Sequence, residues 1–113
     1  MANLPKIDAA NRLKPLSYDP QTERFMTYDE IVNRQAKIVP VEELSHDQLV
    51  RLIVERQRVG PDYKMADLNG RMLTRDQVVE EIVNGTEFGT MMVEAEASYL
   101  ADFIEQIRAA LAR

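Results

Sequence analysis

The chain has 113 residues, of which 45% are apolar and only 6% aromatic, so it suits one small domain with a mostly aliphatic core. Its 19 acidic residues outnumber the 14 basic ones, which argues against binding nucleic acid or an anionic membrane surface. The lack of cysteine excludes disulfides and thiolate chemistry. With no apolar run long enough to span a bilayer and no visible secretory signal, we expect a cytoplasmic protein.

Residues 1–25 show no stable hydrophobic period. Pro5, Pro15 and Pro20 interrupt any helix and favour extended or turn geometry before them. The segment still carries scattered apolar residues, namely Leu4, Ile7, Leu13, Leu16, Tyr18 and Phe25. We interpret residues 1–25 as an extended arm that docks on a folded surface, with a disordered tail as the alternative. The remainder, residues 26–113, is predicted to be a single α-helical domain.

Three capping boxes mark where helices begin in that domain. In each box a Ser or Thr hydroxyl and a Glu or Gln three residues later satisfy free N–H groups of the first helical turn. The boxes pair Thr27 with Glu30, Ser45 with Gln48, and Thr74 with Gln77. They predict a short helix over about 28–36, a longer one over about 45–59, and a third that stops at Asn84-Gly85.

One hairpin is predicted between the second and third helices, over residues 62–73. Apolar residues stand on both sides of Asn69-Gly70, and both positions of this pair tolerate a positive φ. The Asn-Gly pair is therefore the expected turn.

The longest periodic segment runs from Thr86 to the end of the chain and predicts a long helix. Six apolar residues recur along it at spacings of four and three, as in a coiled-coil seam: Val93, Ala97, Leu100, Ile104, Ile107 and Leu111. A second apolar row lies beside them and contains Phe88, Met92, Tyr99, Phe103 and Ala110. Two rows are wider than one partner helix covers, so we predict that the six-residue seam contacts a second chain. The alternative is that the short helix over 28–36 and the arm cover this face within one chain.

Gly89 is unexpected in the first turn of this helix, where glycine costs about 0.5–1 kcal/mol relative to alanine. Close approach of another backbone, from the hairpin or the arm, would explain it. Simple tolerance near a helix end is the alternative.

One stretch partly resembles a calcium-binding loop. If Gly70 takes the invariant glycine position, Asp67, Asn69 and Asp76 fall at ligand positions three, five and twelve. The first ligand position is then Met65, which supplies no oxygen, and the last is Asp where Glu is usual. A hairpin turn followed by a capped helix explains these residues more simply, and a metal-responsive switch stays as an alternative function.

Residues for catalysis are missing or isolated. His46 is the only histidine and directly follows a helix cap, and Ser17, Ser45 and Ser98 have no nucleophile-elbow context. The four glycines are too dispersed to form a phosphate-binding loop. We therefore predict no catalytic residue, no cofactor and no metal, and expect that the protein is not an enzyme.

These patterns predict a mainly α fold: a small helical bundle with one short β-hairpin and a long C-terminal helix. The expected function is a non-enzymatic protein–protein interaction or assembly module that forms a homo-oligomer through the C-terminal helix. The first alternative is a small accessory or regulatory subunit that docks on an enzyme or a larger particle.

Overall fold

The computed structural model describes residues 3–34 and 36–112. Residues 1–2 of the predicted arm, Gln35 of the predicted short helix and Arg113 at the end of the predicted domain lie outside this range. The elements are α1 (Ala9–Leu13), β1 (Ser17–Asp19), β2 (Arg24–Met26), α2 (Tyr28–Val32), the 3-10 helix η1 (Val41–Glu43), α3 (His46–Val59), β3 (Lys64–Ala66), β4 (Met72–Thr74), α4 (Arg75–Asn84) and α5 (Glu87–Leu111). The mainly α fold with a long C-terminal helix is confirmed.

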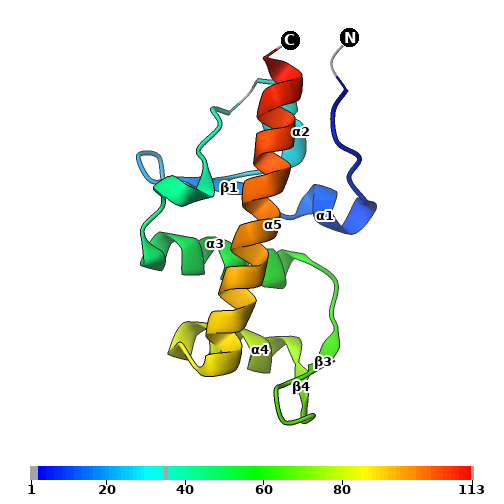
Figure 1. The fold of residues 1–113 in the computed structure, drawn as a ribbon, viewed down its shortest axis with the longest axis vertical. Helices are drawn as coiled ribbons and strands as arrows, with labels where there is room; N and C mark the ends of the chain where they lie inside the picture. The colour runs from blue at the N-terminus through cyan, green and yellow to red at the C-terminus, as the bar shows by residue number, and fades with distance from the viewer. Residues whose placement is uncertain (1–2, 35, 113) are drawn as a thin grey trace.

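Helix α5 is the axis of the molecule. It runs along the long dimension of a body that measures 46 × 28 × 19 Å, and α3 and α4 lie across it (Figure 1). The predicted helical bundle is not confirmed, because the two longest of the other helices, α3 and α4, lie across α5 instead of running beside it (Figure 1).

Two hydrophobic clusters lie at opposite ends of α5. The first surrounds its C-terminal half and includes Leu16, Tyr18, Met26, Tyr28, Ile31, Leu52, Leu100, Phe103, Ile104 and Ile107. The second surrounds its N-terminal half and includes Ile53, Val54, Leu73, Val78, Val79, Ile82, Phe88 and Val93. Because Leu52 belongs to the first cluster and Ile53 to the second, α3 and α5 together connect the two.

All three predicted capping boxes are present, at the starts of α2, α3 and α4. Thr86 caps α5 as expected, with its hydroxyl accepting the N–H of Gly89 at 3.0 Å. Helix α4 ends at Gly85, whose φ of 66° is the left-handed cap that glycine adopts readily. Helix α2 is shorter than predicted because Arg34 takes a left-handed conformation, with a φ of 59°, two residues after Val32.

The arm region contains structure that the sequence did not predict. Strand β1 pairs with β2 in an antiparallel hairpin, and the short helix α1 precedes them, capped by the Asp8 carboxylate. Leu16 is fully buried, and the Ser17 hydroxyl donates a hydrogen bond to the carbonyl of Val39. The predicted boundary between residues 25 and 26 falls inside β2, so β1 and β2 join the arm to the first hydrophobic cluster.

The predicted hairpin is formed by β3 and β4, which pair Met65 with Leu73. Gly70 has a φ of 81°, and the Asp67 carboxylate accepts the N–H groups of Asn69 and Arg71 at 2.9 Å each. The turn is therefore stabilised by one glycine conformation and one aspartate side chain. Leu73 points into the second cluster, which attaches the hairpin to α4 and α5.

Candidate protein-interaction site

The predicted interface on α5 lies mostly inside the chain's own core. Val93, Leu100, Ile104 and Ile107 are buried, the last three among the first hydrophobic cluster and Val93 in the second. Ala97 and Leu111 are half-buried. A second chain would reach the four buried side chains only if the domain opened.

The α5 seam is covered by the arm and by the short helix α2, which is the alternative in which one chain covers its own seam. Leu16 and Tyr18 of the arm, together with Tyr28 and Ile31 of α2, pack in the same cluster as Leu100, Ile104 and Ile107. The second apolar row is also mostly covered, since Phe88, Phe103 and Ala110 are buried and Met92 is half-buried. Tyr99 remains 39% exposed at the edge of this row.

A buried polar network also ties the arm to α3 and α5. The Arg56 side chain, on α3, is only 2% exposed. Its Nη1 donates to the carbonyl of Pro15 at 2.9 Å, and its Nη2 donates to Asn11 Oδ1 at 3.0 Å and lies 3.5 Å from Glu96 Oε2 on α5. The Arg56 guanidinium also lies over the ring of Tyr99, 5.7 Å from its centroid.

The network continues from Glu96 towards the second hairpin. Gln57 donates to Glu96 Oε1 at 2.7 Å and accepts the Tyr63 hydroxyl at 2.7 Å. Burial raises the pKa of Tyr63, and the negative charge of Glu96 adds to this effect. The opposite charges of Arg56 and Glu96 compensate each other, so we assign this network a structural role.

We expect Arg56→Met to lower the free energy of unfolding by about 2–3 kcal/mol, because it leaves Glu96 without its ion-pair partner and the Pro15 carbonyl without a donor. Because methionine keeps much of the side-chain volume, the decrease in the free energy of unfolding measures the loss of the polar contacts. Chemical denaturation measures the change. Arg108→Met, at an exposed ion pair on α5, is the control and should change stability by less than about 0.5 kcal/mol; equal effects for the two variants would contradict the structural role of the network.

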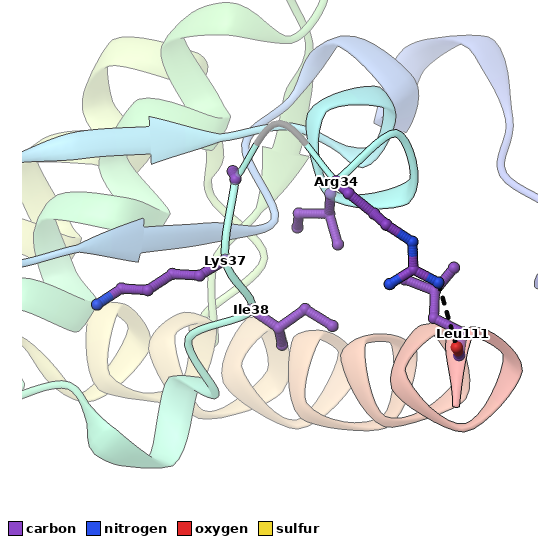
Figure 2. A pocket seen from close by; sticks show the side chains of 6 residues that line it. Arg34, Lys37, Ile38 and Leu111 are labelled. Atoms are coloured by element: carbon purple, nitrogen blue, oxygen red, sulfur yellow. Dashed lines mark hydrogen bonds between the residues drawn. The ribbon is translucent and has the colours of Figure 1, made fainter. Parts of the chain in front are cut away.

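One end of the predicted interface remains open. Leu111 lines a shallow hollow of about 450 Å³ whose other apolar walls are Ile31, Ala36 and Ile38 (Figure 2). Ile31 is buried, whereas Ala36, Ile38 and Leu111 are half-buried. The hollow therefore exposes the edge of the first hydrophobic cluster at the C-terminal end of α5.

Two basic residues stand at this hollow, and only one is directed across it. The Arg34 guanidinium extends over the hollow and donates to the carbonyl of Leu111 at 3.4 Å, a long hydrogen bond (Figure 2). Lys37 points away, and its Nζ lies 3.4 Å from Gln21 Oε1 and 3.8 Å from Asp19 Oδ1. Among the described residues, Arg34 forms no ion pair.

The backbone of Arg34 is also unusual. A non-glycine residue with a φ near +60° costs roughly 1–2 kcal/mol, and such positions often lie at ligand-binding sites. No sequence pattern indicates this conformation, because Arg34 follows Asn33 in a segment whose residues are typical of a helix. The sequence did indicate that Arg56 is buried, because this residue falls on the apolar face of α3, four residues after Leu52.

The residues considered for metal binding and catalysis are separate from this hollow. Both carboxylate oxygens of Asp67 are used by the turn, which lowers the pKa of Asp67 mainly through the N–H of Arg71. Asp76 lies in the first turn of α4 and His46 is exposed at the start of α3. Within residues 3–34 and 36–112, no cluster of three or more His, Cys, Asp or Glu side chains is arranged to hold a metal ion.

No protein-family model, no curated protein and no solved structure matches this chain. In the part of the chain that the structure describes, no helix combines the length and apolar character needed to cross a membrane.

Proposed function

We propose that this protein is a non-enzymatic protein-interaction module that docks on a partner protein through the hollow at the C-terminal end of α5. The observation that carries the proposal is the open apolar edge at Leu111 beside Arg34, whose side chain is exposed and whose backbone is strained. We therefore favour the accessory-subunit alternative over self-association through the α5 seam, because four of the six seam residues are buried in the chain's own hydrophobic clusters.

The chemistry of the hollow indicates what the partner presents. Apolar walls favour an aliphatic side chain. The full positive charge of Arg34 exceeds the partial negative charge of about one half that the C-terminus of α5 contributes, so the hollow favours a carboxylate next to that side chain. The partner is thus a segment with Leu, Ile or Val adjacent to Asp or Glu.

A competing explanation is that Arg34 only caps the last turn of α5. Basic side chains commonly hydrogen-bond the final carbonyls of a helix, and the Arg34–Leu111 contact has this form. At 3.4 Å the bond is weak, and capping does not require the left-handed backbone of Arg34. Replacing Arg34 by glycine separates the two roles.

We expect Arg34→Gly to raise the free energy of unfolding by about 1 kcal/mol, because glycine adopts a φ of 59° without strain. The same variant should lose partner binding, because it removes the guanidinium. Thermal denaturation measures the first effect. Methyl NMR of Ile31, Ile38 and Leu111 measures the second, with short Leu-Glu and Leu-Lys peptides as probes.

The proposal predicts that the Leu-Glu peptide shifts these methyl signals in the wild type, that the Leu-Lys peptide does so more weakly, and that Arg34→Gly abolishes the difference. Arg108→Gln, which neutralises an exposed arginine outside the hollow, is the charge control and should bind like the wild type. If neither peptide shifts the signals at millimolar concentration, or if both peptides act equally, docking through this hollow is wrong.

A further inference from the structure

A second surface, independent of the hollow at Leu111, lies along the outer side of α3. It is a groove of about 380 Å³ between β2 and α4. Its apolar residues are Phe25, Val50, Val54 and Val83, of which Val83 is 60% exposed. A groove with apolar walls and an exposed valine at its edge is suited to a protein contact.

Four charged residues of α3 line the same groove and alternate in sign. Asp47, Arg51, Glu55 and Arg58 follow one another at spacings of four, four and three, which places them on one side of the helix. The order along the helix is therefore negative, positive, negative, positive. Read in the opposite direction, the same row is positive, negative, positive, negative.

Most of these charges lack a partner within the chain. Among the described residues, Asp47, Glu55 and Arg58 form no ion pair, and Arg51 contacts the Tyr18 hydroxyl at 3.0 Å and Glu23 at 3.9 Å. Asp47 and Arg58 are about 16 Å apart along the helix, at 1.5 Å per residue, and are too distant to pair with each other. A row of this kind also suits ion pairs within one helix, but no two of these four residues form one in the structure.

We propose that the face of α3 that lines this groove packs against the same face of α3 in a second copy of the chain, in antiparallel orientation. In that orientation Asp47 of each copy lies opposite Arg58 of the other, and Arg51 lies opposite Glu55, so every charge meets its opposite. The contact is isologous, with the same residues used by both copies. A parallel arrangement would place like charges together and is disfavoured.

The groove is small and its charged row is mostly exposed, so the dimer should be weak, with a dissociation constant of roughly 10–100 µM. Sedimentation equilibrium of the full chain measures this value. Asp47→Arg alone and Arg58→Asp alone each replace two attractive pairs per dimer by repulsive ones. We expect each variant to dimerise about tenfold more weakly or worse than the wild type.

Two combinations of these substitutions test directly whether residue 47 of one copy lies opposite residue 58 of the other. The double variant with both Asp47→Arg and Arg58→Asp restores opposite charges across the dimer and should associate like the wild type. An equimolar mixture of the two single variants should also recover association, because the arginine introduced in one chain then faces the aspartate introduced in the other. Asp76→Arg makes the same charge change at the matching position of α4, outside the groove, and should leave dimerisation unchanged.

Thermal denaturation of each variant at low protein concentration shows whether it is folded. A wild type that stays monomeric at about 1 mM would overturn the proposal. So would folded single variants that associate as strongly as the wild type, or a double variant no better than either single one. None of these outcomes bears on the hollow at Leu111, because the two surfaces share no residue.

Discussion

Gly89→Ala should strongly destabilise the protein, although alanine is the better helix former. A Cβ atom at residue 89 would overlap the carbonyl oxygen of Glu81 and lie 2.8 Å from the backbone nitrogen of Ile82. Both are main-chain atoms of α4, so relief requires moving α4 away from α5 and opening the second hydrophobic cluster. We expect a loss of about 3 kcal/mol in the free energy of unfolding, at the upper end for overpacking.

Chemical denaturation measures this loss, and Gly85→Ala is its matched control. Gly85 has open space around it but a φ of 66°, so alanine there should cost only about 1 kcal/mol of backbone strain. If Gly89→Ala instead stabilised the protein by the roughly 1 kcal/mol expected from helix propensity, the close packing of α4 on α5 would be wrong.

The features predicted correctly from the sequence are those that depend on a few neighbouring residues. A capping box needs only four positions, and Thr27, Ser45 and Thr74 each start a helix as predicted. The Asn69-Gly70 turn is similarly local. Gly89 was expected to meet another backbone, and it does, but the backbone belongs to α4 instead of the hairpin or the arm.

The features that the sequence did not reveal depend on contacts between distant segments. Strands β1 and β2 have three residues each, too few to show an alternating pattern, and they are held by the burial of Leu16 and Met26 in the first hydrophobic cluster. The apolar seam of α5 was evident, but periodicity does not say which surface covers it. Leu16 and Ile31 lie about 70 or more residues before Ile104 and still supply that cover.

The candidate site was predictable only in part for the same reason. Leu111 was identified from its place in the seam, and it is the member whose surroundings include an open hollow. Arg34 was missed because its left-handed backbone departs from the helical pattern around it. The charge alternation of α3 can be read from the sequence, but its exposure along a groove requires the fold.

The central claim of this account is that the four buried residues of the α5 seam belong to the chain's own core and that docking uses surfaces left open, such as the edge at Leu111. Leu100 and Ile107 are fully buried, so changing both to Asp places two carboxylates in the first hydrophobic cluster. The cost of burying them should exceed the total stability of about 5–15 kcal/mol that is typical of small domains. As a control, Ser98→Asp with Ala109→Asp adds the same charge on the exposed side of α5 and should leave the protein folded.

The decisive measurement is far-UV circular dichroism of the Leu100→Asp, Ile107→Asp double variant, with sedimentation of the same sample. The account predicts loss of the helical signal and of cooperative melting. A soluble, fully helical monomer, obtained from a wild type that is dimeric under the same conditions, would show instead that the seam is an interface between chains.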